Sequence, residues 1–366
     1  MKKNPIYLGV MSGTSLDGVD AVAFDTETHR LIAAHSLDFS TELRAATLAL
    51  QAPQADELHQ SQLVANQLAN LYARAINELM VQTNLAISDI VAVGVHGQTI
   101  RHRPELAYTI QLNQPARIAE QTGLTVVSDF RARDIAAGGQ GAPLVPAFHD
   151  ALWRDAALNR VVLNIGGFAN ISVLNRGTAT FGYDTGPGNV LMDAWIQLHQ
   201  GTTYDANGEW AASGRVNVEL LNALLSEPYF AQAHPKSTGR DAFHLDWLNA
   251  HLTQLAPISP VDVQATLLAL TVQTITNEFT RSSPQANEMI VCGGGAYNTA
   301  LLNALRLALP TVTIDTSDAH GIAAQHVEAA AFAWLAARTM NRLSGNLPAV
   351  TGAKGFRVLG CVTFAN

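Results

Sequence analysis

Residues 6–24, IYLGVMSGTSLDGVDAVAF, decide how the chain begins to fold. Residues 6–10 and 19–24 are short apolar runs, and each is typical of a buried strand. The stretch between them, residues 11–18, is rich in glycine, serine and threonine, which favour turns. The sequence therefore predicts a hairpin whose turn is small and polar.

The predicted turn lacks two well-known catalytic signatures. No lysine follows its glycines, so it is not a phosphate loop of the Gly-x4-Gly-Lys type. Asp17 stands where the Gly-x-Ser-x-Gly elbow of serine hydrolases needs a glycine. A hydroxyl-rich turn with one acid can instead donate hydrogen bonds to phosphate oxygens, while Asp17 holds a hydrated Mg²⁺. A plain structural turn capped by Asp17 is the alternative.

The same pattern returns about 155 residues later. Apolar runs at residues 160–165 and 171–174 flank the small-residue stretch 166–170. Two halves of like construction are therefore predicted. The backbone amides of two such turns could face each other across a cleft that binds a polyphosphate.

A third apolar run, residues 178–183, leads into Asp184 and a Gly-Pro-Gly sequence at 186–188. We expect Gly-Pro-Gly to end this strand and to free backbone N–H groups, with a helix at residues 190–199. Asp184 is then a single acid at a strand end. A turn cap is the alternative role for this aspartate.

Helices and strands alternate in the remaining sequence. Apolar spacing predicts helices at residues 57–82, 263–279, 298–309 and 327–340, and strands at 90–95, 124–128, 289–292 and 312–314. His96 and Gln98 follow the strand at 90–95, and Arg131 and Arg133 follow the strand at 124–128. Because α/β sheets place working residues at strand ends, these four are candidate site residues. A role at a domain interface is the alternative for each.

Three consecutive glycines, residues 293–295, stand between a predicted strand and a predicted helix. Without side chains they let the backbone approach a planar ligand closely, as an adenine site requires. A plain strand-to-helix turn is the alternative.

Length and composition limit the classes of function. The 366 residues are 48% apolar and 14% charged, which favours a folded protein of two domains with a cleft between them. A formal charge of −8 without a long basic run argues against a nucleic-acid partner. Two cysteines are too few for a disulfide framework. With no signal peptide and no apolar stretch of bilayer length, we expect a cytoplasmic protein without a membrane partner.

Seven motifs, spread over nearly the whole chain, resemble those of the anhydro-N-acetylmuramic acid kinases. They are residues 9–20 (GVMSGTSLDGVD), 96–99 (HGQT), 138–146 (GGQGAPLVP), 164–167 (NIGG), 182–189 (GYDTGPGN), 235–240 (PKSTGR) and 292–295 (CGGG). Gln325 departs from the pattern, because relatives commonly carry an acid near this position, whereas Glu328 is retained. Any helix-start or substrate contact made through Gln325 is therefore in doubt.

The resemblance implies an α/β actin-like ATPase fold, as in hexokinases and actin, with two duplicated domains around a nucleotide cleft. We place the domains at residues 1–155 and 156–366, with part of the C-terminal helix free to pack back on the first domain and an adenine-site turn near 293–298. The implied protein is a homodimeric kinase of peptidoglycan recycling. It converts 1,6-anhydro-N-acetylmuramic acid, ATP and water into N-acetylmuramic acid 6-phosphate and ADP, with Mg²⁺ accompanying ATP.

The resemblance and the residue types together assign the candidate roles. Asp184 is the catalytic base, and Asp17 is a magnesium ligand. The substrate contacts are His96, Gln98, Arg131, Gly186 and Glu328, and the ATP contacts are Gly13, Thr14, Ser15, Leu16, Asp17, Gly18, Val19, Asp20, Gly166, Gly167, Asn170, Gly293, Gly294, Gly295 and Asn298.

The chemistry of an anhydro sugar explains why one acid could suffice. O6 is tied to C1 and carries no proton, so it can attack phosphorus only as its bond to C1 breaks, and water must attack C1. Asp184 would take a proton from that water, as the base of an inverting glycosidase does, while the γ-phosphate captures O6. The alternatives are an ordinary sugar or hydroxyl kinase of the same fold and a nucleotide-gated actin-like ATPase.

Overall fold

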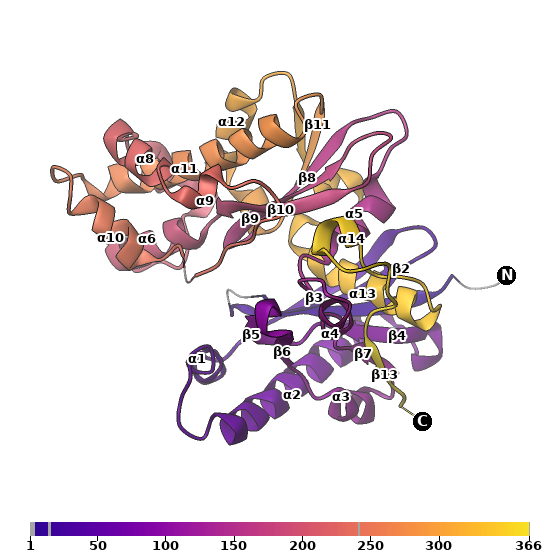
Figure 1. The fold of residues 1–366 in the computed structure, drawn as a ribbon. Helices are drawn as coiled ribbons and strands as arrows, with labels where there is room; N and C mark the ends of the chain where they lie inside the picture. The colour runs from indigo at the N-terminus through magenta and orange to yellow at the C-terminus, as the bar shows by residue number, and fades with distance from the viewer. Residues whose placement is uncertain (1–3, 14–15, 241, 366) are drawn as a thin grey trace. The chain divides into compact units, whose positions relative to one another are not determined.

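The computed structural model describes residues 4–13, 16–240 and 242–365, and the chain divides into two units (Figure 1). Unit 1 contains the described residues up to Leu152 together with those from His326 onward, and unit 2 contains Trp153–Gln325. The predicted boundary lies at residue 155, with residues 156–366 in the second domain. In the structure, the residues from 326 onward belong to the same unit as the N-terminus.

Unit 1 is built on a mixed six-stranded sheet in the order β13-β7-β4-β1-β2-β3. Strand β1 pairs antiparallel with β2 and parallel with β4, which confirms the hairpin predicted from residues 6–24. A separate hairpin of β5 and β6 follows β4. The strands are β1 (Ile6–Met11), β2 (Gly18–Asp25), β3 (Arg30–Asp38), β4 (Ile90–Val95), β5 (Gln98–Arg103), β6 (Tyr108–Leu112), β7 (Val126–Ser128) and β13 (Cys361–Thr363).

The longest helix of unit 1, α2 (Glu57–Thr83), buries one apolar stripe, as its spacing predicts. Leu68, Tyr72 and Ile76 on this stripe lie in the core that the helix forms with β2 and β3. The other helices are α1 (Thr41–Ala49), α3 (Pro115–Thr122), α4 (Ala132–Ala136), α5 (Val145–Trp153), which ends at the unit boundary, α13 (Val327–Met340) and α14 (Pro348–Thr351).

Unit 2 has a five-stranded sheet in the order β10-β9-β8-β11-β12. Helix α11 (Pro260–Ser282) packs against β9 and β10 and fills much of the core. The strands are β8 (Arg160–Ile165), β9 (Phe168–Leu174), β10 (Phe181–Pro187), β11 (Glu288–Cys292) and β12 (Thr313–Thr316). The other helices are α6 (Val190–Gln200), α7 (Glu209–Ser213), α8 (Val218–Leu225), α9 (Pro228–Ala231), α10 (Leu245–Leu252) and α12 (Thr299–Ala308). None of the helices among the described residues is long and apolar enough to span a bilayer.

The two sheets share a five-strand core. Unit 1 has the order β3-β2-β1-β4-β7 and unit 2 the order β10-β9-β8-β11-β12. In each, the first two pairs are antiparallel and the last two are parallel. This agreement in order and direction confirms the duplicated α/β construction predicted from the two hairpins.

Strand β10 differs from the prediction. It was expected to end before Gly-Pro-Gly, yet it continues to Pro187. Asp184 therefore lies inside the strand, next to an irregular pairing between Asp184 and Gly186. Pro187 lacks an N–H donor, which is tolerated because β10 is an edge strand. Gly186 has a φ of 150°, a backbone angle that suits such an irregularity.

Helix α13 packs directly on β1 and β4, and Figure 1 shows this yellow C-terminal helix among the purple elements of unit 1. A Cβ placed on Gly9 would lie 1.9 Å from the Ala329 carbonyl oxygen, and a Cβ on Gly94 would lie 2.1 Å from that of Phe332. The helix itself is rich in alanine. The backbones therefore approach more closely than larger side chains would allow.

Replacing Gly94 by alanine should destabilise unit 1, because the new Cβ would overlap the Phe332 carbonyl. Overpacking of this kind costs about 1–3 kcal/mol. Urea unfolding followed by circular dichroism measures the change. The control is Val91→Ala at a 42% exposed position of the same strand, which should change the free energy of unfolding by only about 0.5 kcal/mol. Equal losses in the two variants would contradict the close packing of α13.

Candidate active site

The turn between β1 and β2 is tied to the rest of unit 1 through its backbone. The Gly13 carbonyl accepts hydrogen bonds from the Leu16 N–H at 3.3 Å and from Gln98 Nε2 at 3.2 Å. Ser12 Oγ lies 2.8 Å from the Tyr72 hydroxyl. The protein itself therefore uses these polar groups, although Gly13 and Leu16 were predicted to contact ATP.

The remaining residues predicted for this turn differ in exposure. The Asp17 carboxylate is 71% exposed and lies 3.8 Å from Arg44. The Val19 side chain is buried in the core of unit 1, so only its backbone is available to a ligand. Thr14 and Ser15 lie outside the described residues.

Gly18 and Asp20 belong to strand β2. A Cβ on Gly18 would lie 2.4 Å from the Leu37 carbonyl oxygen, so pairing of β2 with β3 requires glycine here. Asp20 accepts a hydrogen bond from Ser36 at 2.5 Å and lies 3.9 Å from His326. Within the described ranges no three His, Cys, Asp or Glu side chains form a metal cluster. Mg²⁺ is commonly held by one or two carboxylates plus phosphate oxygens, and the exposed Asp17 fits that requirement.

Three of the predicted substrate contacts, far apart in the sequence, meet in unit 1. Arg131 Nε donates to His96 Nε2 at 3.0 Å, and Arg131 Nη1 donates to the Gly141 carbonyl at 2.8 Å. Glu328, in the first turn of α13, interacts electrostatically with Arg131. The fourth candidate from strand ends, Arg133, is exposed on α4.

Burial governs the charges of this group. It lowers the pKa of His96 well below its usual value, and the charge of Arg131 lowers it further, so the imidazole is neutral. Burial also lowers the pKa of Arg131 to about 10, although the carboxylates of Glu328 and Asp134 oppose this. The pKa of Glu328 is raised by burial and lowered by Arg131. Since His96 accepts on Nε2, its proton lies on Nδ1.

Two of the candidate residues in unit 1 carry a buried polar side-chain atom without a hydrogen-bond partner. His96 Nδ1 and Gln98 Oε1 make no hydrogen bond to the part of the chain that the structure describes. Buried polar atoms are nearly always paired, in the protein or with a bound molecule. The unpaired donor on His96, beside the Arg131 guanidinium, and the unpaired acceptor on Gln98 are groups that a polar ligand could satisfy.

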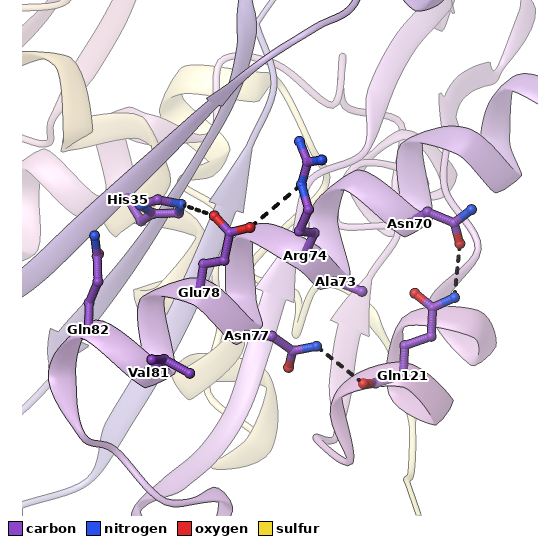
Figure 2. Close-up of a pocket in the computed structure, with 9 residues that line it drawn as sticks. All are labelled: His35, Asn70, Ala73, Arg74, Asn77, Glu78, Val81, Gln82 and Gln121. Atoms are coloured by element: carbon purple, nitrogen blue, oxygen red, sulfur yellow. Dashed lines mark hydrogen bonds and ion pairs between the residues drawn. The ribbon is translucent and has the colours of Figure 1, made fainter.

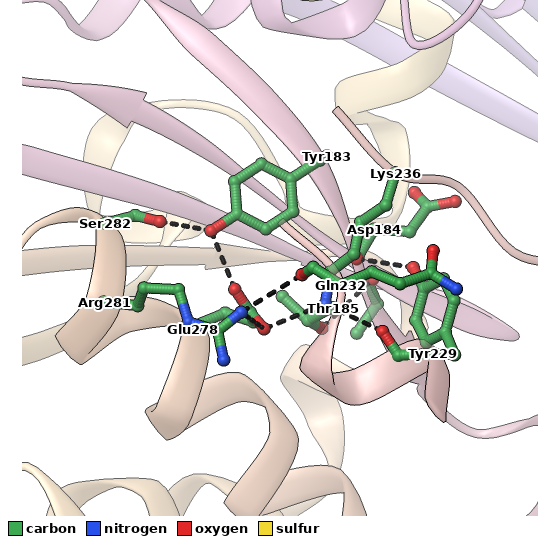
Figure 3. A network of polar contacts seen from close by, with 10 residues as sticks. Tyr183, Asp184, Thr185, Tyr229, Gln232, Lys236, Glu278, Arg281 and Ser282 are labelled. Atoms are coloured by element: carbon green, nitrogen blue, oxygen red, sulfur yellow. Dashed lines mark hydrogen bonds and ion pairs between the residues drawn. The ribbon is translucent and has the colours of Figure 1, made fainter. Parts of the chain in front are cut away.

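Asp184 in unit 2 is held by groups that lie outside the sheet (Figure 3). Its N–H donates to the Lys236 carbonyl at 3.2 Å, and its carbonyl accepts from the Tyr229 hydroxyl at 2.7 Å. The Thr238 N–H donates to Asp184 Oδ2 at 3.0 Å. Oδ1 makes no hydrogen bond to any described residue, which leaves it available to a ligand or water.

The environment makes Asp184 a stronger base than an ordinary aspartate. Burial raises its pKa from 3.8 to about 6, although the hydrogen bond from Thr238 favours the ionised form. The carboxyl group is therefore ionised at neutral pH and can still accept a proton. The hydroxyl of Thr238 is buried and, among the described residues, unpaired.

The glycines around β10 have packing roles in the structure. The Gly188 N–H donates to the Gly167 carbonyl at 2.9 Å, so the expectation that Gly-Pro-Gly frees this amide was wrong. A Cβ on Gly188 would lie 2.4 Å from the Gly166 carbonyl oxygen, which explains the close approach of the two turns. Gly186 is buried, and a Cβ there would meet the Phe230 ring at 2.8 Å.

The predicted adenine-site turn packs on the end of β8. Gly293 and Gly295 lie so close to it that a Cβ on either would come within 2.4 Å of Asn164 or Ile165. A Cβ on Gly294 would have no described atom within 4 Å. Two of the three glycines are therefore explained by packing, and Gly294 borders open space.

Two predicted ATP contacts, Asn298 and Asn170, have positions that the fold explains. Asn298 Oδ1 caps α12 by accepting from the Leu301 N–H at 3.0 Å. Asn170 lies in β9 directly opposite Asp184. The first asparagine thus shapes a helix start, and the second is a neighbour of the candidate base.

The residues that hold Asp184 received no role from the sequence. Lys236 and Thr238 lie in the motif at 235–240, so the resemblance contained a signal for them. Glu278, which binds Lys236, lies on the buried stripe of α11, and a glutamate at such a position was a second signal. No spacing or composition pattern marks Tyr229.

A separate hollow of about 710 Å³ on unit 1 contains none of the predicted site residues (Figure 2). Its polar groups bind one another: His35 Nε2 lies 2.7 Å from Glu78, and Arg74 lies 3.8 Å from the same carboxylate. Gln121 Nε2 donates to Asn70 at 2.9 Å. Because these groups are satisfied within the protein, the hollow offers no argument for a ligand.

Comparison with known proteins connects this arrangement to one family. The model of the family described as anhydro-N-acetylmuramic acid kinase matches residues 5–365. Curated proteins with this name include one from Bordetella avium, 52% identical, which covers 97% of this chain and 95% of that protein. Others come from Nitrosomonas europaea, 50% identical over 97% and 99% of the two chains, and Pseudomonas syringae pv. tomato, 49% identical over 97% and 98%.

A solved structure supports the fold. Component A of (R)-2-hydroxyglutaryl-CoA dehydratase from Acidaminococcus fermentans has a TM-score of 0.51 and 14% sequence identity, covering 90% of this chain and 97% of that chain. At this identity the likeness concerns the fold alone. With the shared strand order of the two units, it confirms the predicted actin-like α/β class.

Replacing Asp184 by asparagine should stabilise the protein at neutral pH. A pKa raised from 3.8 to about 6 means that the folded state binds the proton more tightly, so stability falls as pH rises between these values, by about 3 kcal/mol. Asparagine carries no charge and can still accept from Thr238. Denaturant unfolding of both proteins against pH measures this, and parallel curves would contradict the raised pKa.

Proposed function

This chain belongs to the anhydro-N-acetylmuramic acid kinase family, and we propose that it opens 1,6-anhydro-N-acetylmuramic acid with water and transfers the γ-phosphate of ATP to O6. The products are N-acetylmuramic acid 6-phosphate and ADP, which suits the recycling of cell-wall sugar. The observation that carries the proposed mechanism is the Asp184 carboxylate, which has a raised pKa, one oxygen held by Thr238 and the other open.

The proposed reaction couples bond cleavage to phosphoryl transfer. Water attacks C1, and Asp184 accepts its proton on Oδ1 while the Thr238 N–H stays on Oδ2. The C1–O6 bond breaks as O6 bonds to the γ-phosphorus, and ADP leaves with the electrons of the broken P–O bond. The phosphoryl group thus takes the place that a general acid has in an inverting glycosidase. A base with a pKa of about 6 suits this step near neutral pH.

The polar cluster of unit 1 supports proposed contacts to the sugar. The planar guanidinium of Arg131 matches the lactyl carboxylate, and Glu328 balances its charge in the absence of substrate. The N-acetyl group has one C=O and one N–H. The unpaired donor on His96 and the unpaired acceptor on Gln98 complement these two groups. Gly186 is proposed to line the sugar near Asp184.

ATP is the phosphoryl donor of this kinase family, and its contacts on this chain are proposed. We assign the phosphates to the turn at residues 11–18 and to Gly166 and Gly167, and the adenine to the open face of Gly294. The exposed carboxylate of Asp17 would hold a hydrated Mg²⁺. When bound, Mg²⁺ neutralises charge on the phosphate oxygens.

Ring opening by water predicts that solvent oxygen enters the product at C1. One turnover in ¹⁸O-labelled water with ATP and the anhydro sugar should give singly labelled sugar phosphate by mass spectrometry. Product incubated in labelled water with the Asp184→Asn variant corrects for spontaneous exchange at C1. Phosphorylated sugar without ¹⁸O would indicate an ordinary hydroxyl kinase. A rate of ADP release that does not depend on the sugar would indicate a nucleotide-gated ATPase.

Asp184→Asn should lower turnover about 10²- to 10⁴-fold, the usual contribution of a positioned base. In the unmodified enzyme kcat/KM should fall below a pH of about 6, where Asp184 becomes protonated. Steady-state assays of ADP release measure both effects. The matched control is Asp246→Asn, an exposed acid at the start of α10 in the same unit, which should keep normal turnover. Near-normal turnover of the Asp184 variant would remove this residue from the role.

A further inference from the structure

One segment, residues 228–240, supplies the contacts outside the sheet that hold Asp184. We call it the clamp segment. It carries the Tyr229 hydroxyl, the Lys236 carbonyl and the Thr238 N–H, which bind Asp184 at 2.7, 3.2 and 3.0 Å. Because β10 is the edge of its sheet, no strand on that side could replace these contacts. The place of the candidate base therefore depends on what holds the clamp segment.

A buried ion pair joins the clamp segment to α11 (Figure 3). Lys236 Nζ lies 2.9 Å from Glu278 Oε1, and the two side chains are only 1% and 3% exposed. The same ammonium group donates to the Tyr229 carbonyl at 3.3 Å and lies 4.8 Å above the centre of the Tyr229 ring. Lys236 thus connects two parts of the clamp segment to each other and to the helix.

Glu278 connects the other side of the network. Its second oxygen accepts from the Tyr183 hydroxyl at 2.9 Å, and Arg281 lies 3.1 Å from the first. Tyr183 directly precedes Asp184 in β10, and the backbone carbonyl of Lys236 accepts a hydrogen bond from the Asp184 N–H. The glutamate is therefore bonded to both neighbours of the candidate base, one in the strand and one in the clamp segment.

Stability alone does not explain such a pair. Removing two charges from water costs several kcal/mol each, and well-packed apolar side chains in their place are often as stable or more so. Directed hydrogen bonds, in contrast, fix orientation in a way that apolar packing does not. The ion pair lies where orientation matters, because Lys236 is two residues before Thr238 and Glu278 is hydrogen-bonded to Tyr183, the residue before Asp184.

Building on the proposed function, we propose that the Lys236–Glu278 pair is a positioning device, which fixes the clamp segment on α11 so that Tyr229 and Thr238 hold Asp184 in its reactive orientation. Neither Lys236 nor Glu278 hydrogen-bonds the carboxylate, so both are positioning residues. This assigns a role to the lysine of the motif at 235–240.

The test replaces the pair by apolar residues of similar size, Lys236→Met with Glu278→Leu, so that no unpaired charge remains buried. The variant should fold and lose about tenfold or more in kcat, because a small displacement of a base is enough for that loss. The acid limb of its pH profile should move to higher pH, since the Thr238 N–H that favours the ionised Asp184 is no longer held. A purely structural role would lower stability without moving the acid limb.

The matched control removes another ion pair of unit 2, Arg160→Met with Glu288→Leu. This pair joins the first residues of β8 and β11, and it lies at the other end of the sheet from the rung of Asn164, Asn170 and Asp184. The control should keep the kcat and the acid limb of the unmodified enzyme. A control that changed both as much as the test variant would overturn the proposal, as would a test variant that kept both.

A readout without turnover separates this proposal from the proposed function. ¹³C NMR of labelled aspartate follows the Asp184 carboxyl group directly, and Asp184→Asn identifies its signal. The pKa should rise in the Lys236→Met, Glu278→Leu variant even if the anhydro sugar is not the substrate. An unchanged pKa would overturn the positioning role, whatever the activity. If the double variant does not fold, Tyr183→Phe removes one bond to Glu278 and one to Ser282 without a change of charge, and it should shift the pKa the same way.

Discussion

The Asp184 carboxylate lies in a largely buried environment, and contacts from several parts of unit 2 compensate for this burial. A charge taken out of water needs hydrogen bonds in return, and an edge strand offers few on its outer side. The clamp segment supplies them at the backbone and at one carboxylate oxygen only. The other oxygen stays open, and burial keeps the pKa near 6. Basicity and fixed orientation thus come from the same arrangement. The chemistry of ring opening needs both, because water is a poor nucleophile without a base aligned to it.

Unit 1 meets the opposite requirement, a half-buried cation, Arg131. Arg131 donates hydrogen bonds to the neutral imidazole of His96 and to the Gly141 carbonyl. Its interaction with Glu328 is electrostatic and is not a close ion pair. Such a guanidinium keeps hydrogen-bonding capacity for an anionic ligand, whereas a tight ion pair would have used it. The neutral state of His96 follows from the same burial that lowers the pKa of Arg131. This arrangement supports the proposed contact between Arg131 and the lactyl carboxylate of the sugar.

The sequence predicted the hairpins, the duplication and the main helices, because these depend on local apolar spacing and small-residue turns. It did not predict that β10 continues through Pro187, since only the edge position of the strand, a tertiary fact, makes a missing N–H harmless. It suggested Asp184, His96 and Arg131 as site residues. It did not predict that the Gly188 N–H donates a hydrogen bond to the Gly167 carbonyl. Tyr229 and Glu278 reach the site through contacts of high sequence separation, which no local pattern reveals.

The path of the chain has a consequence for biosynthesis. Unit 1 combines residues that precede unit 2 with residues that follow it, because unit 2 is inserted between Leu152 and His326. On the ribosome, Gly9 and Gly94 remain uncovered until α13 has been made, after the whole of unit 2. Unit 2 is contiguous and can fold first. Termination of translation just before residue 326 would leave the residues of unit 2 complete and unit 1 without α13.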